Sequence, residues 1–340
     1  MGNRITPELS ALLDHVRGKR VALMTHWDAD GITSGAMLYH LIEPTARSVF
    51  TSSKGEVFLI EEQDFPPESE IIICSDIQPS SHLDPQKVIY IDHHPHPHPE
   101  QFLMTIHDPG AVSTSTLLWQ RLIPDTTNPY FIFLALVGYF GDGGSKKTIP
   151  ERLYDEAMAQ LPDLMKKNAS RYKKGDFYYE IEKYVSDLNT GKRMHWSGDL
   201  PLEMLKNIKH QDLYVNKVHP IANELAEYKL KLRSLYRMKV DLKDLRHIRY
   251  GVIASNRNIQ GVLCARYMDD KPVMIMNRFN GKVIGSMRVP DNNAFDAGKF
   301  LDSFNGQIDS FLGGGHEKAG GFTVASDQLD SFLRLLDKNG

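Results

Sequence analysis

The sequence predicts an α/β protein whose N-terminal domain contains a parallel sheet that is covered on both faces. Short apolar runs with the length of buried strands alternate with longer segments that have the apolar spacing of helices. The strand candidates are residues 21–25, 71–74 and 88–91, and the helix candidates are residues 32–42, 111–122 and 129–140. Alternation of this kind favours parallel strands joined by crossover connections.

Local signals predict the remaining N-terminal elements. A surface helix is predicted at residues 7–17, and residues 47–60 hold one or two further strands. The helix candidate at residues 129–140 is apolar nearly all round, which indicates that it is buried. We expect it to end at Gly138, and the glycine-rich loop that follows can turn Asp142 toward a site.

A second, smaller α+β domain is predicted in the C-terminal part of the chain. Its elements are expected at residues 250–254, 258–268, 273–277 and 283–289. Asn280-Gly281 stands between the last two runs and is a strong signal of a β-hairpin. A helix at residues 219–239 connects the domains. The predicted divisions are a first domain at residues 1–215, a helical connector at 216–245, and a domain at 246–340 that closes a cleft over the first.

Composition excludes several classes of protein. The 40 Lys and Arg residues against 43 Asp and Glu residues give a net charge of -3, which does not suit a protein that coats long nucleic acid. Cys74 and Cys264 lie far apart and form no CxxC pair, so we expect buried thiols in a reducing compartment. The apolar runs are too short to span a membrane, and the N-terminus lacks the apolar core of a signal peptide. The expected location is the cytoplasm, with no membrane partner.

Acids and imidazoles stand at the end of each strand candidate. They are His26, Asp28 and Asp30 after the first, Asp76 after the second, and Asp92, His93 and His94 after the third. Because the carboxyl ends of parallel strands meet at one edge of a sheet, we expect these side chains, together with Asp142, to lie close to one another.

Carboxylates crowded in this way repel each other unless a cation neutralises them. The set offers oxygen and imidazole ligands without a thiolate, and it is too large for one tetrahedral zinc ion. Two divalent ions that share a bridging carboxylate suit it better, and Mn²⁺ is favoured over Zn²⁺. Paired ions of this kind promote phosphoester hydrolysis, which is therefore the predicted chemistry.

The order of these motifs resembles the signatures of the DHH phosphoesterase superfamily. The matching elements are His-x-Asp-x-Asp-Gly at residues 26–31, Asp76, Asp-His-His at residues 92–94, and Gly-Asp at residues 141–142. Near the C-terminus, Gly313-Gly314-Gly315-His316 resembles the glycine-rich element of the DHH-associated domain. The resemblance extends from residue 25 to residue 322, and His26 stands two residues before Asp28, a spacing similar to that of RecJ-type exonucleases.

The resemblance implies a role for each position. His26 and Asp28 hold one ion, Asp30, His93 and Asp142 hold the other, and Asp76 bridges the two. Asp92 orients His93, and His94 faces the scissile phosphate. In the second domain the implied substrate contacts are Ser286, Arg288, Gly313, Gly314, Gly315 and His316, of which Arg288 and His316 join His94 in stabilising the transition state.

We therefore expect a metal-dependent phosphodiesterase that uses two Mn²⁺ ions, with Mg²⁺ or Co²⁺ as substitutes. The expected substrates are short linear oligoribonucleotides and dinucleotides, including the linear products of cyclic-dinucleotide breakdown, which are cleaved to mononucleotides. Only one helix is predicted after the glycine motif, so no appended nucleic-acid module is expected, and this favours a short substrate.

The alternatives within the enzyme class are a RecJ-like single-strand exonuclease, a cyclic-dinucleotide phosphodiesterase and a nucleotide phosphatase. A catalytically inactive nucleotide-binding module is the alternative from another class. No obligate protein partner is inferred, and the oligomeric state, a homodimer included, is left open.

Overall fold

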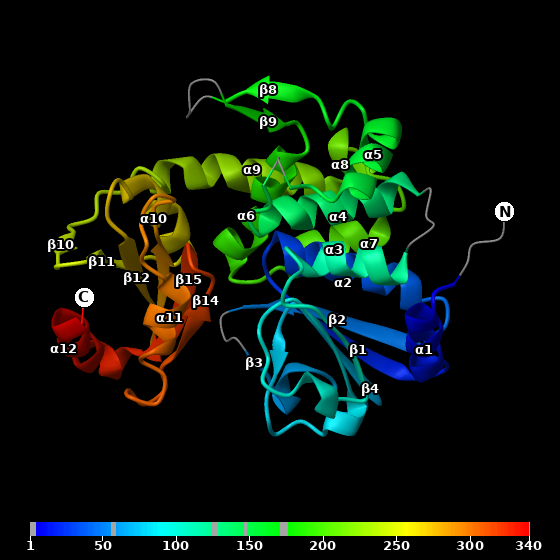
Figure 1. Cartoon of the computed structure of the whole chain (residues 1–340), viewed down its shortest axis with the longest axis horizontal. Helices are drawn as coiled ribbons and strands as arrows, with labels where there is room; N and C mark the ends of the chain where they lie inside the picture. The colour runs from blue at the N-terminus through cyan, green and yellow to red at the C-terminus, as the bar shows by residue number, and fades with distance from the viewer. Residues whose placement is uncertain (1–4, 56–58, 124–127, 146–147, 171–175, 340) are drawn as a thin grey trace. The chain divides into compact units, whose positions relative to one another are not determined.

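The computed structural model describes residues 5–55, 59–123, 128–145, 148–170 and 176–339 (Figure 1). The chain separates into two compact units. The first consists of Met1–Lys192 with Ser197–Lys229, and the second of Arg193–Trp196 with Leu230–Gly340. One division falls inside helix α9 (Pro220–Leu235), within the stretch that was expected to connect two domains.

The first unit contains the predicted parallel sheet, whose strands lie in the order β2-β1-β4-β6-β7. Their bounds are β1 Arg20–His26, β2 Ser48–Lys54, β4 Ile71–Ser75, β6 Val88–Asp92 and β7 Met104–His107. The three strands that carry the motifs, β1, β4 and β6, are neighbours. Thr25 pairs with Ser75, and Ser75 pairs with Ile91, so the three strands end at the same level. This register confirms that the polar strand ends meet at one edge of the sheet.

The two faces of this sheet are buried by different means. Alternate residues such as Leu23 and Ile73 pack against helices, whereas Met24 and Cys74 on the other face pack under short segments that include Ile60 and Leu83. The helices of the first face are α1 (Pro7–Val16), α2 (Ala29–Ile42), α3 (Thr114–Leu122) and α4 (Pro129–Gly141). The other face is covered by the pair β3 (Leu59–Ile60) and β5 (Gln78–Pro79) and by the turns η1 (Glu62–Asp64), η2 (Pro85–Lys87) and η3 (Pro99–Gln101).

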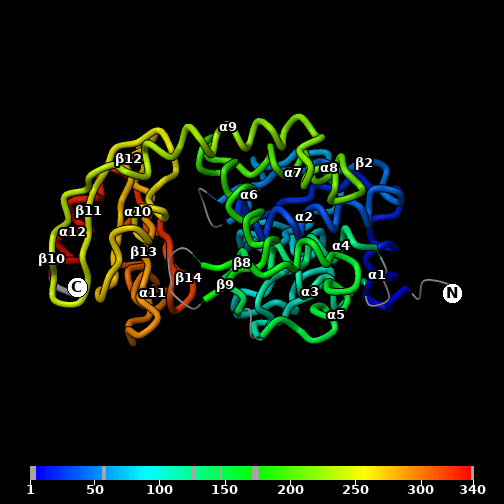
Figure 2. Tube along the Cα trace, turned by 90° about the horizontal axis from the view of Figure 1, so that it is seen from above, coloured from blue at the N-terminus to red at the C-terminus, as the bar shows by residue number. Residues whose placement is uncertain are grey.

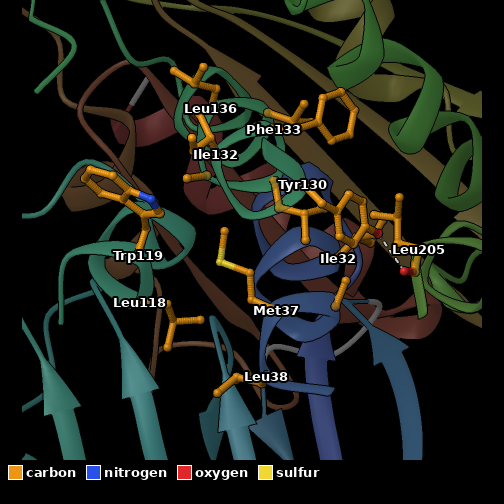
Figure 3. Close-up of a cluster of buried hydrophobic side chains, with 14 of the residues drawn as sticks. Ile32, Met37, Leu38, Leu118, Trp119, Tyr130, Ile132, Phe133, Leu136 and Leu205 are labelled. Carbon is orange, nitrogen blue, oxygen red and sulfur yellow. Dashed lines mark hydrogen bonds between the residues drawn. The ribbon is translucent and has the colours of Figure 1, made fainter. Parts of the chain in front are cut away.

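Helices α2, α3 and α4 lie side by side over the first face (Figure 1). Figure 3 shows Ile32, Trp119 and Tyr130 in one cluster between them, where the Tyr130 hydroxyl donates a 2.6 Å hydrogen bond to the carbonyl of Leu205. Several predicted boundaries were wrong, and two of them lie beside the candidate ligands. Helix α2 begins at Ala29, which places Asp30 in its first turn, and α4 continues past Gly138 to Gly141.

Elements that were not predicted from sequence fill much of the stretch that follows. They are α5 (Glu151–Gln160), β8 (Lys167–Ala169), β9 (Phe177–Tyr179), α6 (Glu182–His195), α7 (Asp199–Asn207) and α8 (Asp212–Val215). Leu188 of α6 and Leu205 of α7 belong to the same core as α2 and α4, so these helices extend the first unit rather than form a separate domain.

The second unit contains a mixed sheet in the order β10-β11-β12-β13-β15-β14. Its strands are β10 (Lys243–Asp244), β11 (Arg249–Ala254), β12 (Val273–Phe279), β13 (Lys282–Arg288), β14 (Leu312–Gly315) and β15 (Ala319–Ala325). Its helices are α10 (Gln260–Tyr267), α11 (Ala297–Asp302) and α12 (Leu329–Asn339), and the turn η4 spans Ser326–Gln328. The β12–β13 hairpin is confirmed, and both turn residues, Asn280 and Gly281, have positive φ (48° and 73°).

The core of the second unit is rich in phenylalanine. Phe304, Phe322 and Phe332 pack against one another with ring centroids 4.8 to 5.2 Å apart where they are in direct contact. Helix α12 lies beside β11 (Figure 2), where the Tyr250 hydroxyl donates to the carboxylate of Asp337 at 3.4 Å. In the part of the chain that the structure describes, every helix is too short or too polar to cross a lipid bilayer.

Candidate metal centre

The first motif places three polar side chains at the junction of β1 and α2. His26 is the last residue of β1, and Asp28 caps α2 by accepting a 3.2 Å hydrogen bond from the Gly31 amide. Asp30 lies in the first turn of α2 and is fully buried. A Cβ atom at Gly31 would lie 2.3 Å from the His26 carbonyl oxygen, so the sharp strand-to-helix turn requires glycine there.

Asp30 is held by the N-terminus of α3. Its two carboxylate oxygens accept hydrogen bonds from the backbone amides of Thr114, at 2.6 Å, and Ser115, at 2.9 Å. The positive end of the helix dipole favours an anion at this position. Burial, with the nearby carboxylates of Asp76 and Asp142, nevertheless raises the pKa of Asp30 well above its ordinary value. The site therefore has more negative charge than the α3 terminus alone compensates.

Asp76 lies between the two halves of the candidate site. It follows β4 with a left-handed backbone (φ 60°), and its side chain is buried. Its Oδ2 lies 3.7 Å from Nδ1 of His26, and its Oδ1 lies 3.5 Å from Nε2 of His93. The Thr114 hydroxyl donates to the same Oδ1 at 3.1 Å. The two oxygens thus face different histidines, which is the geometry of a shared ligand.

The side chains of the Asp-His-His motif make different contacts. His93 points Nε2 at the Asp142 carboxylate, at 2.9 Å, and its Nδ1 donates to the carbonyl of Ala111 at 3.2 Å. In the neutral ring this bond makes Nε2 the nitrogen with the lone pair, as a metal ligand requires.

The expectation that Asp92 orients His93 was wrong. Asp92 accepts a 2.8 Å hydrogen bond from Nδ1 of His94 and another from the hydroxyl of Tyr90 at 3.1 Å. The physical reason is a local turn of the chain. The Asp92 carboxylate lies beside both the ring and the backbone of His94, and it also accepts a 2.8 Å hydrogen bond from the His94 amide. Asp92 therefore fixes the orientation of His94, and Ala111 fixes that of His93.

Three groups of ligand-type atoms contain Asp76; one of them holds Asp92, His93 and His94, and the other two hold the predicted metal ligands. Of these two, one is His26, Asp28 and Asp76, and the other is Asp30, Asp76, His93 and Asp142. Within each group, one ligand atom of each residue lies within 4.8 Å of those of the other members. The structure thus brings together all six side chains that the sequence predicted as metal ligands. Their oxygen and imidazole donors fit Mn²⁺ and similar divalent ions.

The pKa shifts show how these charges balance without an ion. Burial alone would lower the pKa of each histidine, but adjacent carboxylates outweigh it and raise the pKa of His26 to about 10, of His93 to about 12 and of His94 to about 9. Burial raises the pKa of Asp142 to about 6. Protonated imidazoles therefore supply the counter-charge in the metal-free chain, and a divalent ion must displace their protons to bind.

Comparisons with known proteins agree with the motifs. Residues 20–135 match the model of the DHH family, N-terminal domain, and residues 251–339 match that of the DHHA1 domain. The chain belongs to the DHH superfamily. The DHH match contains His26, Asp30, Asp76 and His93, and the DHHA1 match contains the glycine-rich element. Among curated protein sequences, none matches this chain.

Several solved structures share the fold of this DHH protein. RecJ of Thermus thermophilus in complex with Mn²⁺ is 19% identical, with a TM-score of 0.65 over 99% of this chain and 55% of that chain. An exonuclease RecJ bound to manganese is 19% identical, with a TM-score of 0.61 over 100% of this chain and 96% of that one. The DHH domain of a member of a family of ribosomal proteins is 17% identical, with a TM-score of 0.59 over 99% and 94% of the two chains. The chain spans about half the length of the Thermus RecJ.

Three residues of the DHH centre were missed by the sequence analysis. Thr114 binds Asp76, and Lys192 places its Nζ 3.9 Å from Oδ2 of Asp28. A Cβ atom at Gly138 would lie 2.5 Å from Oδ1 of Asp30, so this glycine lets α4 approach the buried carboxylate. The run Ser-Thr-Ser-Thr at residues 113–116 is a helix-start signal that could have pointed to Thr114. Gly138 and Lys192 carry no comparable local signal.

In the DHHA1 domain, Ser286 and Arg288 lie on one face of β13, because they are two residues apart on the strand. Both face α10, because a Cβ atom at Gly261 would lie 3.5 Å from the Ser286 hydroxyl and from the Arg288 guanidinium. The Arg288 guanidinium donates to the carbonyl of Met287 at 2.8 Å. Among the salt bridges of the described residues, none pairs Arg288 with an acid.

The glycine-rich element forms the edge strand β14, which pairs with β15, instead of an open phosphate loop. The amide of Gly313 donates to the side chain of Asn305 at 2.9 Å, and its contact with substrate stays a prediction. Gly314 has open space where a side chain would stand, and Gly315 has a φ of 134° that L side chains rarely adopt. His316 follows the strand and is exposed.

Proposed function

We propose that this protein is a two-metal phosphodiesterase that hydrolyses short linear oligoribonucleotides and dinucleotides to mononucleotides. The observation that supports it most is the pair of ligand groups that share Asp76. Two groups joined by one carboxylate suit a pair of ions, and a pair of ions suits in-line displacement at phosphorus. The superfamily to which the chain belongs includes metal-dependent phosphoesterases.

In this proposal the two ions are Mn²⁺, each held by one group. His26 and Asp28 hold one, Asp30, His93 and Asp142 hold the other, and Asp76 contacts both. The bound ions supply Lewis acidity, which activates water and neutralises charge on the phosphoryl group. The RecJ structures that share this fold were solved with Mn²⁺ and, in another crystal of the Thermus protein, with Mg²⁺, and Mg²⁺ or Co²⁺ is proposed as a substitute here.

His94 is the proposed contact to the scissile phosphate. Asp92 accepts from its Nδ1, which fixes the orientation of the imidazole ring. Although burial lowers it, the pKa of His94 is raised to about 9 by Asp92, so the ring is cationic at neutral pH. A fixed cation of this kind stabilises the charge that develops on a phosphoryl group in the transition state. From the DHHA1 domain, the proposed substrate contacts are Ser286, Arg288, Gly313, Gly314, Gly315 and His316.

The short substrate is supported by charge. A net charge of -3 offers little general attraction for a long polyanion, whereas individual cations such as Arg288 can bind one phosphate. The second candidate is a RecJ-like single-strand exonuclease. The fold shared with RecJ and the His26–Asp28 spacing favour that candidate.

Hydrolysis of a length series separates the two candidates. The substrates are linear and cyclic dinucleotides, a pentamer and a long single strand, each as RNA and DNA, with Mn²⁺ at a fixed salt concentration. We expect kcat/KM to be highest for the linear dinucleotide RNA and to fall as the chain lengthens. A maximum at the long strand would replace the proposal by the RecJ-like one. An absence of turnover on all substrates, with Mn²⁺ shown to be bound, would favour a nucleotide-binding module.

A further inference from the structure

The two ligand groups of the DHH centre differ in burial and charge. We name the group of His26, Asp28 and Asp76 the outer group, and the group of Asp30, Asp76, His93 and Asp142 the inner group. The His26 and Asp28 side chains are 19% and 20% exposed, whereas His93 is 3% and Asp142 11% exposed. The inner group has three carboxylates and the outer group two. An ion in the inner group therefore meets more negative charge and less competition from water.

A lysine increases this difference. Nζ of Lys192, on α6, lies 3.9 Å from Oδ2 of Asp28, and the lysine side chain is 20% exposed. The same Asp28 oxygen lies 2.8 Å from Nδ1 of His26. An ammonium at this distance offsets part of the charge that Asp28 contributes to an ion. Among the ion pairs of the described residues, none joins a lysine or arginine to Asp30, Asp76 or Asp142.

We propose that Lys192 weakens metal binding at the outer group, so that the centre binds its two ions with unequal affinity. This inference rests on the metal pair of the proposed function. The inner ion is then retained, and the outer ion exchanges with the surrounding solution. Activity is consequently controlled by the free concentration of the divalent ion, through occupancy of the outer group.

The physical reason is repulsion between the ammonium and a divalent ion that shares Asp28 with it. Partial exposure screens the repulsion, which limits the expected change in affinity to about tenfold rather than many orders of magnitude.

The test is calorimetric titration of the chelated full-length chain with Mn²⁺. Lys192→Met removes the charge and keeps the length of the side chain, and Lys192→Arg keeps the charge. Lys183→Met is the matched control, because Lys183 lies in the first turn of the same helix and pairs with Glu180. Thermal unfolding in EDTA establishes that each variant is folded, and Lys192→Gln replaces Lys192→Met if that variant does not fold.

We expect two classes of site in the wild type. Lys192→Met should tighten the weaker class by about tenfold and leave the stronger class unchanged, whereas Lys192→Arg and Lys183→Met should match the wild type. The Mn²⁺ concentration for half-maximal turnover should fall in parallel. Two classes of site with no change, or with weaker binding, in Lys192→Met would overturn the role of Lys192 and leave the proposed function intact. A wild type that binds no Mn²⁺ would overturn both.

Discussion

Asp76 combines a left-handed backbone, burial and an orientation toward two histidines. Asn tolerates the left-handed region about as well as Asp, so Asp76→Asn keeps the backbone and the shape of the side chain while it removes the charge. We expect turnover to fall by at least about a thousandfold, or ~4 kcal/mol in the barrier, with both Mn²⁺ sites weakened. Stability in EDTA should fall, because hydrogen bonds to His26 and His93 outweigh burial and lower the pKa of Asp76, so its charge stabilises the metal-free fold.

The measurements are kcat, Mn²⁺ stoichiometry and Tm for Asp76→Asn beside Asp330→Asn, an exposed control on α12. A variant that keeps more than about a tenth of the wild-type kcat, a barrier change of ~1.4 kcal/mol, would show that Asp76 does not bridge two ions. A loss of metal at one class of site only would assign Asp76 to a single ion.

The histidine pKa values give the metal-free protein a defined pH dependence. The folded-state values of about 10 for His26 and about 12 for His93 lie above the usual value of about 6.5. A raised folded-state pKa adds stability that is complete below about pH 6.5 and is lost progressively as the pH rises toward the folded value. The metal-free protein should therefore have a lower Tm at about pH 8.5 than at about pH 6.5.

The stabilisation that bound Mn²⁺ gives should have the opposite pH dependence and increase as the pH rises. Because Mn²⁺ competes with protons for both rings, its affinity should rise between about pH 6.5 and about pH 8.5, and binding should release protons. Tm in Mn²⁺ and in EDTA at the two pH values tests the first point, and calorimetry in two buffers of different ionisation enthalpy tests the second. A Tm difference that is independent of pH, with no proton release, would contradict protonated rings in the metal-free centre.

At the scale of elements, three helices meet at one buried carboxylate. α2 carries Asp30, α3 binds it through the Ser115 amide, and Gly138 lets α4 pack over both. A methyl group on Gly138 would lie 2.3 Å from the Ser115 hydroxyl and 2.5 Å from Oδ1 of Asp30. Alanine favours the helix by about 1 kcal/mol, but overpacking in a core costs about 1–3 kcal/mol and displaces the carboxylate.

We therefore expect Gly138→Ala to leave stability unchanged or lower it by up to about 2 kcal/mol, and to weaken Mn²⁺ binding by at least about tenfold. Gly141→Ala is the matched control, since it lies one turn later on α4 and its nearest contact would be the Cβ of Ala29 at 3.1 Å. Urea unfolding in EDTA and Mn²⁺ titration provide the two readouts. Equal effects of the two substitutions on Mn²⁺ binding would mean that the space at Gly138 has no special role.

The sequence was most informative where a feature is local. Strands β1, β4 and β6 and the polar residues after them follow from apolar runs of a few residues, and their common edge follows from parallel topology. Other contacts depend instead on how the chain packs. Examples are the hydrogen bond of Asp30 to the N-terminus of α3 and the position of Lys192 beside Asp28, which join segments far apart in the chain. No local pattern encodes such contacts. For the same reason, α6 and α7 were missed although both join the core.

At the scale of the whole molecule, the candidate ligands and the candidate substrate contacts belong to different units. All six metal-ligand candidates lie in the first unit, and Arg288 and His316 lie in the second. In the proposed function one substrate depends on both units. Binding energy from a contact remote from the reacting phosphorus then serves to position that phosphorus, so its loss lowers kcat/KM for substrates that make the contact and for no others.

Arg288→Ala tests this dependence. For a linear dinucleotide we expect kcat/KM to fall by about two orders of magnitude, or ~3 kcal/mol, because the guanidinium no longer binds a phosphate or base. For bis-p-nitrophenyl phosphate, a minimal ester without a second nucleotide, we expect little change. Arg266→Ala, a charge-matched change on α10 in the same unit, serves as the control.

A long-strand exonuclease would respond differently to Arg288→Ala. Many phosphates would share the binding, so the loss would be smaller and would depend on salt. Each substrate is therefore measured with each protein at two salt concentrations. Equal losses on the minimal ester and the dinucleotide would place Arg288 in the reaction centre or in the fold, and the proposal that the second unit selects short substrates would be wrong.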